Sequence, residues 1–108
     1  MTIPDPSPVF RALADPTRRA LFETLCADGE ATVVTLTRSA GVSQPAVSKH
    51  LRQLREVGLV ADRPDGRQTH YRARIEALAP LVAWTGRQAA FWEQKLDGLE
   101  DLLRRMDR

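Results

Sequence analysis

Residues 43–53 contain a run of polar side chains that could hydrogen-bond to the edges of DNA bases. Gln44 carries an amide that can bind adenine through two hydrogen bonds, and the Ser48 hydroxyl can bond to several base edges. Lys49 can reach guanine or a phosphate, and Pro45 offers an apolar surface to a thymine methyl group. These side chains predict recognition of a base sequence, whereas the plain alternative is a polar surface helix.

A helix that reads DNA must be held rigidly on its own core, and residues 43–57 predict such a helix. Ser43 is a good N-cap, Pro45 fits the first turn, and Gly58 ends the helix. The connection that starts at Gly41 is as tight as a helix-turn-helix requires. Three apolar residues mark the face that packs on the core: Val47, Leu51 and Leu54.

Positive charge is concentrated around this helix. The chain of 108 residues has a net charge of +2, with 16 Lys and Arg against 14 Asp and Glu. Residues 38–74 hold eight basic and three acidic residues, which gives +5, whereas residues 1–37 carry −2 and residues 75–108 carry −1. A local basic patch can be the electrostatic footprint of a polyanion partner. A solvated basic face is the alternative that charge alone leaves open.

Two strand-like runs follow the helix, at residues 59–63 and 67–73, and they flank a turn signal at residues 64–66. The pattern predicts a β-hairpin. Arg63 and Arg67 border the turn and could enter a minor groove or bind phosphate. Each arginine taken alone could equally be a solvated loop charge.

Three segments on the N-terminal side also predict helices. A short helix covers residues 9–14, and a second helix follows Asp15 as N-cap and Pro16 at its first position, up to Gly29. Residues 33–40 predict a short third helix, although their β-branched side chains also favour a strand. The buried stripe expected for the second helix is Ala20, Leu21, Phe22 and Leu25.

Three short helices before a hairpin predict a mainly α fold, the winged helix-turn-helix. We expect residues 1–7 to form a flexible arm, because three prolines occur among the first eight residues. Residues 8–108 then form one domain, which ends in a dimerisation helix at about residues 76–106. Pro80 fits the first turn of that helix or a break between a short and a long helix.

Large apolar side chains recur along the last helix. Trp92, Leu96, Leu99, Leu103 and Met106 follow one another at spacings of four and three, a heptad-like pattern. We expect a dimer through the first and last helices, since large aromatic residues commonly anchor interfaces. The aromatic members could also line a pocket for an apolar effector. The expected interface residues are Val9, Phe10, Leu13, Trp84, Phe91, Trp92, Leu96, Leu99 and Leu103.

Three segments resemble the ArsR (ArsR/SmtB) family of bacterial winged-helix repressors: "VFRALADPTRRALFETL", "GVSQPAVSKHLRQLREVGLV" and "DGRQTHYRA". The similarity extends over residues 8–105. It implies a homodimer that binds an inverted-repeat operator near its own promoter and blocks transcription. It also carries the family's DNA contacts to Gln44, Pro45, Ser48, Lys49 and Arg67. The complete set of expected DNA-binding residues is Ser43, Gln44, Pro45, Ser48, Lys49, Arg52, Arg63 and Arg67.

The ligands of the family's metal sensors are missing from the corresponding helices. Those sensors use cysteine pairs in the third helix or Asp, His and Glu sets on the last one. Here residues 33–40 contain no Cys, His, Asp or Glu, and the last helix contains no His. We therefore expect a member of the branch that does not sense metals, with no metal and no cofactor. His50 is expected to orient its helix or touch a phosphate, and His70, on the hairpin, to lie at the surface or touch a phosphate.

Several other classes of protein are not expected. No paired carboxylates, nucleophile–base pair or phosphate-cradling glycine loop indicates an enzyme. A winged helix that binds proteins instead of DNA is the alternative function, against which the basic segment argues. The single cysteine, Cys26, cannot form an internal disulfide and fits a reducing cytosol. Neither a signal peptide nor a membrane span is expected, so the predicted location is cytoplasmic, on the nucleoid.

Overall fold

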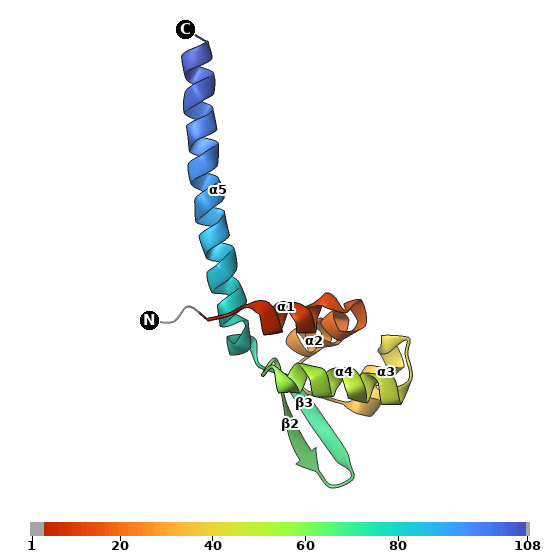
Figure 1. The fold of residues 1–108 in the computed structure, drawn as a ribbon. Helices are drawn as coiled ribbons and strands as arrows, with labels where there is room; N and C mark the ends of the chain where they lie inside the picture. Colours follow the sequence, from red (N-terminus) through yellow and green to blue (C-terminus); the bar gives the residue numbers. More distant parts are fainter. Residues whose placement is uncertain (1–3, 108) are drawn as a thin grey trace.

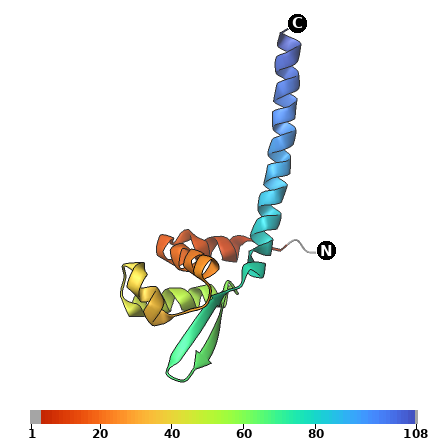
Figure 2. The ribbon, with the colours of Figure 1, turned by 180° about the vertical axis from the view of Figure 1, so that it is seen from behind.

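One long helix projects from a body of four shorter α-helices and a small sheet (Figures 1 and 2). The computed structural model describes residues 4–107. The β2–β3 hairpin, here called the wing, and the long helix lie at opposite ends of a molecule 73 Å long. The elements in chain order are α1 (Ser7–Ala14), α2 (Pro16–Asp28), β1 (Ala31–Thr32), α3 (Val33–Ala40), α4 (Gln44–Glu56), β2 (Val60–Asp65), β3 (Gln68–Ala73), the 3-10 helix η1 (Ile75–Leu78) and α5 (Ala79–Met106).

Side-chain caps fix where α2, α3 and α4 begin. Asp15, Thr32 and Ser43 each accept a hydrogen bond from the backbone N–H three residues later, at 2.8, 3.2 and 3.3 Å. Each bond satisfies an N–H that the first helical turn leaves without a partner. Gly41 takes a left-handed φ of 72°, which lets the chain reverse between α3 and α4. The caps predicted at Asp15 and Ser43 are confirmed, and so is a helix instead of a strand at residues 33–40.

The predicted hairpin forms, but its turn lies further along the chain than expected. β2 continues through Pro64 and Asp65 and pairs with β3 along its full length, so Gly66 and Arg67 alone make the turn. Proline is tolerated there because the strand order β1-β3-β2 places β2 at an edge, where a missing N–H removes no ladder bond. β1, which pairs with β3, is an addition that the sequence did not predict.

The two ends of the domain also differ from the expected boundaries. α1 begins at Ser7, inside the expected arm of residues 1–7, and residues 1–3 of that arm lie outside the described residues. The last helical segment opens with η1, and Pro80 lies in the first turn of α5. Both alternatives for Pro80 are therefore met, since it lies in the first turn of the long helix that follows the short η1. The fold class, a mainly α winged helix-turn-helix, is confirmed.

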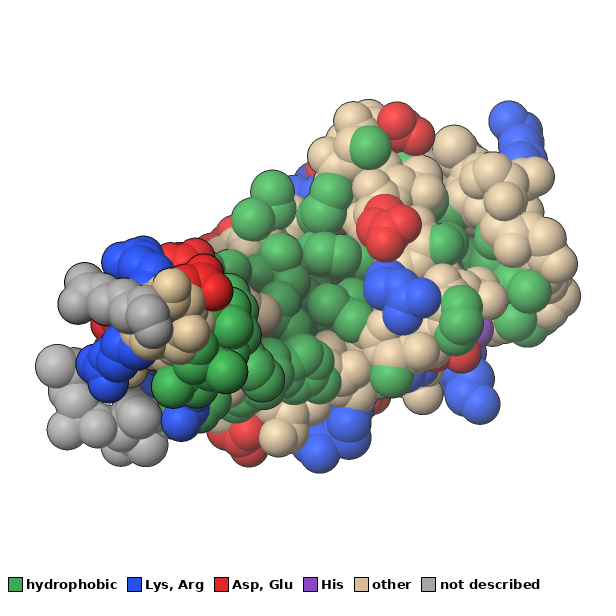
Figure 3. All heavy atoms as spheres, turned by 90° about the horizontal axis from the view of Figure 1, so that it is seen from above, with side chains coloured by type: hydrophobic (Ala, Val, Ile, Leu, Met, Phe, Trp, Pro, Cys, Tyr) green, Lys and Arg blue, Asp and Glu red, His purple; other side chains and the backbone are tan. Residues whose placement is uncertain are grey.

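α5 carries its large apolar side chains on its outer surface. No residue of Ala79–Met106 is buried, and the heptad stripe from Trp92 to Met106 is 50–71% exposed. Seen from above, hydrophobic side chains form a continuous patch along α5 and onto the body of the molecule (Figure 3). Since packing of an amphipathic face supplies most helical stability in proteins, a bare stripe on so long a helix points to a further contact.

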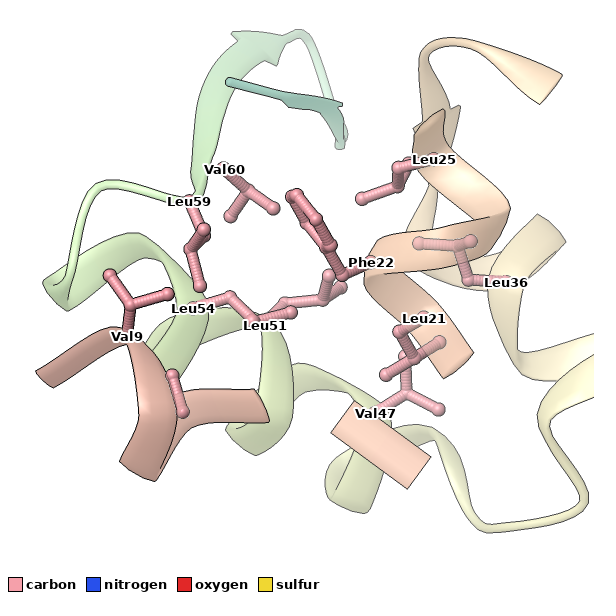
Figure 4. Close-up of a cluster of buried hydrophobic side chains, with 11 residues drawn as sticks. Val9, Leu21, Phe22, Leu25, Leu36, Val47, Leu51, Leu54, Leu59 and Val60 are labelled. Carbon is pink, nitrogen blue, oxygen red and sulfur yellow. The ribbon is translucent and has the colours of Figure 1, made fainter. Parts of the chain in front are cut away.

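The core lies where α1, α2 and α4 meet the start of the wing (Figure 4). The stripe of α4 is fully buried, as predicted, with Val47, Leu51 and Leu54 each 0% exposed. Ala20, which we expected in the buried stripe of α2, is exposed, since Leu21, Phe22 and Leu25 fill that face. The other buried residues are Val9, Ala12, Leu36, Leu59 and Val60.

Leu54→Ala is expected to lower the free energy of unfolding by about 2–5 kcal/mol, because it removes a fully buried side chain and leaves a cavity. Urea denaturation followed by circular dichroism, at one protein concentration, measures the loss. The matched control is Val34→Ala on α3, where the side chain is 43% exposed and the expected change is below about 0.5 kcal/mol. Equal losses in the two variants would contradict the packing of Figure 4.

Candidate nucleic-acid interface

A cleft of about 440 Å³ separates α4 from the wing. Gln44, Ser48 and Arg52 project into it from successive turns of α4, and Arg67 lines it from the turn of the wing. The start of α3 closes one end of the cleft. The arrangement joins groups that can hydrogen-bond to bases with cations that can bind phosphate, which is the combination that DNA recognition needs. The remaining lining residues are Thr32, Val33, Val34, Arg55, Gln68, Thr69 and Tyr71.

Burial of the apolar side of α4 turns its polar side toward solvent. With the stripe of Val47, Leu51 and Leu54 against the core, the opposite side of the helix faces outward. The predicted DNA-binding residues on this side are exposed except for Ser48, which is half-buried at the wall of the cleft. The exposed ones are Ser43, Gln44, Pro45, Lys49 and Arg52.

Ion pairs within the chain engage two cations near the wing, Arg55 at the end of α4 and Arg63 on β2. Arg55 Nη1 lies 2.8 Å from Asp62 Oδ2, and Arg63 Nη2 lies 2.6 Å from Glu30 Oε1. The hydrogen bond from Arg63 lowers the pKa of the Glu30 carboxyl, and the same bond raises the pKa of the guanidinium. Arg63, which we expected at DNA, is thus held against an acidic side chain of its own chain.

Three other predicted cations remain available. Lys49, Arg52 and Arg67 form no ion pair within residues 4–107. Arg67 occupies one of the two positions of the wing turn, the furthest point of the hairpin. Arg52 and Arg67 line the cleft from α4 and from the wing, so positive charge borders the groups that can read bases.

Both histidines lie beside carboxylates. Nε2 of His50 is 3.8 Å from Oδ2 of Asp15, while its Nδ1 is buried without a hydrogen-bond partner. Asp15 also accepts the backbone N–H of Arg18, which lowers the pKa of this carboxyl. His70 lies on the wing with Nδ1 3.5 Å from Glu30 Oε1. Of the two roles expected for His50, its place between α4 and α2 favours orienting the helix.

Some residues of the cleft were not singled out from the sequence. Thr69 and Tyr71 line it from β3, whereas His70 between them lies beside Glu30. Alternation of side chains along a strand places Thr69 and Tyr71 on one face. The two-residue alternation of β3, counted forward from the turn, could have identified Thr69 and Tyr71 from the sequence. Gln53, in contrast, accepts a hydrogen bond from Arg18 and lies outside the cleft.

The expected interface residues of α1 divide between the core and the surface. Val9 is 4% exposed and belongs to the core of its own chain. Phe10 is 39% exposed and packs edge-on against Trp84 of α5, with ring centroids 5.2 Å apart. Phe91 and Trp92 make a similar edge-on pair at 5.9 Å and are 50% and 61% exposed. One aromatic pair therefore joins α1 to the start of α5, and the other lies in the middle of α5.

Residues 4–107 contain no group of three or more His, Cys, Asp or Glu side chains placed to hold a metal ion. None of their helices is both long enough and apolar enough to cross a membrane.

Comparison with known proteins places the sequence among transcriptional regulators. A family model described as a helix-turn-helix domain matches residues 13–63. The HTH-type transcriptional regulator Rv2034 of Mycobacterium tuberculosis is 41% identical over 94% of this chain and 92% of its own length. The arsenical resistance operon repressor of Escherichia coli is 40% identical over 76% of this chain and 67% of its own length.

Solved structures agree with the sequence matches. The crystal structure of an ArsR family transcriptional regulator superposes with a TM-score of 0.74 at 32% identity and covers 85% of this chain and 97% of that chain. A homodimeric winged helix-turn-helix DNA-binding domain from Mycobacterium bovis, a possible ArsR-family regulator, gives 0.61 at 31% identity over 78% and 77%. The matched proteins are transcriptional regulators and not enzymes. By identity along nearly its whole length and by fold, the chain belongs to the ArsR family of winged helix-turn-helix transcriptional regulators.

Proposed function

We propose that the chain is a homodimeric repressor that binds an inverted-repeat operator near its own promoter, in the cytoplasm. The observation that carries the proposal is the cleft between α4 and the wing, where Gln44 and Ser48 lie with Arg52 and Arg67, two cations that form no ion pair within residues 4–107. In a helix-turn-helix protein the second helix enters the major groove and its first residues contact base edges. The related repressor of E. coli supports repression over activation. Repression also needs no surface beyond the one that binds DNA.

The proposed contacts divide into reading and positioning groups. Gln44, Ser48 and Pro45 read base edges, because their side chains are short and lie at the start of α4. Lys49 and Arg52 bind phosphates beside the major groove, together with Ser43 at the N-terminus of the helix. Arg67 reaches a phosphate or the adjacent minor groove from the wing. Arg63 contributes less than Arg67, since Glu30 already accepts its hydrogen bond.

The homodimer forms through the apolar patch of Figure 3. Phe10 of α1 packs on Trp84 of α5, and the exposed aromatic and leucine side chains of these two helices have the composition of an interface core. The homodimeric relative from M. bovis supports the same assembly. A two-fold dimer presents two copies of α4 to two half-sites about one helical turn of DNA apart, hence an inverted repeat. The side-chain pairing of Phe10 with Trp84 favours packing over an effector pocket.

Gln44→Ala and Ser48→Ala are expected to weaken operator binding by about tenfold or more each, since each good base contact contributes about 1–3 kcal/mol of discrimination. The operator is first selected by the wild-type protein from a library of random duplexes, and affinities are then measured by fluorescence anisotropy. A scrambled duplex is the control, and its affinity should change less than about twofold for uncharged side chains. Failure of the wild-type protein to select any sequence would contradict the proposed function and favour a protein-binding winged helix.

Arg67→Ala is expected to reduce both the affinity for DNA and its dependence on salt. Each lost phosphate contact lowers the slope of log K against log salt by about one, so a dimer should lose about two. The measurement is a titration at several salt concentrations. Arg63→Ala removes the same charge from the neighbouring strand, and it should lower the slope less. A slope for Arg67→Ala equal to that of the wild type would show that Arg67 does not contact a DNA phosphate.

Leu99→Glu is expected to convert the dimer to a monomer, because it places a charge in the middle of the apolar stripe of α5. Sedimentation equilibrium measures the mass. Gln94→Glu introduces the same charge five residues away on the opposite side of α5 and should remain dimeric. A dimeric Leu99→Glu variant would show that the stripe is not the interface.

A further inference from the structure

Arg18 connects the three elements that link the proposed dimer face to the DNA-reading helix. Its Nη2 donates to the carbonyl oxygen of Arg11 at 3.0 Å, and its Nε donates to that of Ala12, both in the last turn of α1. Its Nη1 donates to Oε1 of Gln53 on α4. One half-buried guanidinium of α2 thus holds α1 and α4 together, and we call this set of contacts the polar bridge.

Two features explain why an arginine suits this place. The last four carbonyls of a helix have no partner within the helix, so those of Arg11 and Ala12 need donors from elsewhere. The planar guanidinium presents five donors in a fixed fork, whereas an ammonium is a compact charge on a flexible stem. Only the fork can serve two carbonyls and the amide of Gln53 from one position. The bridge therefore defines a direction as well as a distance.

The position of Gln53 separates the bridge from DNA contact. Gln53 follows Gln44 by nine residues, or two and a half turns of α-helix, so it lies on the opposite side of α4 from Gln44. A hollow of about 280 Å³ lies between α1 and the last turns of α4, and both Arg18 and Gln53 line it. The bridge thus spans a place where apolar packing between these helices is incomplete.

A second contact repeats the bridge one turn earlier along both helices. Asp15 precedes Arg18 by three residues on α2, and His50 precedes Gln53 by three residues on α4. The 3.8 Å approach of Asp15 to His50 therefore lies in register with the pair of Arg18 and Gln53. Two points of contact add directional resistance to small rotations of α4, beyond the burial of its apolar side, because hydrogen bonds and ion pairs have a defined geometry whereas hydrophobic contacts have little directionality.

We propose that Arg18 is a positioning residue that sets the angle between α1 and α4 and, through it, the separation of the two α4 helices in the dimer. This inference rests on the dimeric DNA-binding function proposed above. α1 contacts the base of α5 through Phe10 and Trp84, so it belongs to the dimer face. An error in the angle at the bridge is transmitted to α4 in both protomers and changes the half-site spacing that the dimer fits. Arg18 itself makes no contact with DNA.

The first test measures the separation of the α4 helices without DNA. A spin label is attached through Lys49→Cys in a Cys26→Ser background, and dipolar electron resonance gives the distance between protomers. Arg18→Lys keeps the charge but removes the fork, and it should broaden or shift the distance distribution, as should Gln53→Ala. Arg19→Lys is the matched control, because Arg19 bonds only the Leu13 carbonyl of α1, at 2.9 Å, and should keep the wild-type distribution.

The second test measures tolerance of half-site spacing. Duplexes with one base pair added to or removed from the centre of the selected operator are compared with the operator itself. The ratio of affinities should fall by about five- to tenfold in Arg18→Lys and Gln53→Ala, since a loosely held helix is less preorganised. Arg19→Lys should keep the ratio within about twofold. The slope against salt should stay at the wild-type value in Arg18→Lys, unlike that of Arg67→Ala.

Unchanged distances in Arg18→Lys and Gln53→Ala would overturn the inference, and so would equal losses of affinity on all duplexes. If Arg18→Lys fails to fold, Gln53→Ala decides alone, since alanine is favourable on a helix. A wild-type protein that selects no DNA sequence would refute the proposed function, while the distance measurement would still test the bridge. A chain without any dipolar signal between protomers would overturn the inference directly.

Discussion

Burial of one side of α4 is the constraint on which the rest of the structure depends. Val47, Leu51 and Leu54 are inaccessible to solvent, and they pack against residues from α1, α2 and the start of the wing. A helix fixed on this side must present Gln44 and its neighbours outward. The same contacts place the wing beside α4, because Leu59 and Val60 continue the core directly after the helix ends. The cleft is therefore a consequence of core packing, and its polar lining is free to vary without changing the fold.

Ion pairs within the chain engage part of the positive charge of the basic segment, residues 38–74. Residues 38–74 carry a charge of +5, but Arg55 and Arg63 are already engaged by acidic residues of the same chain. Arg74 pairs with Glu76 in the same way, and the cations of this segment without an ion pair in residues 4–107 are Arg38, Lys49, Arg52, Arg67 and Arg72. The ion pairs of Arg55 and Arg63 are solvent-exposed, so they contribute little to the free energy of unfolding. Their effect is to orient the wing, since Arg63 ties β2 to the segment just before β1 through Glu30.

Local signals predicted the helices and caps, whereas contacts between distant segments were beyond the sequence. The N-caps at Asp15, Thr32 and Ser43 depend on side chains three residues from their donors, so they can be read directly. β1 could not be predicted, because two residues carry no period and its strand exists only by pairing with β3. The turn was misplaced because proline usually ends a strand, and only the order of the sheet reveals an edge where it is tolerated. Gln53 and Arg18 lie 35 residues apart, and no spacing rule connects them.

The shape of the molecule explains why directional contacts are needed between α1, α2 and α4. α5, with its exposed apolar stripe, projects away from the body of the molecule, which contains α4 (Figure 1). A dimer held only by α5 would leave the angle of each body to the non-directional packing of the core. A small rotation at the junction of α1 and α4 displaces the far end of α4. Because DNA offers half-sites at a fixed spacing, a regulator of this shape requires rigidity at that junction. Polar groups with defined geometry, held between helices that the core already brings together, provide rigidity that additional apolar area would not.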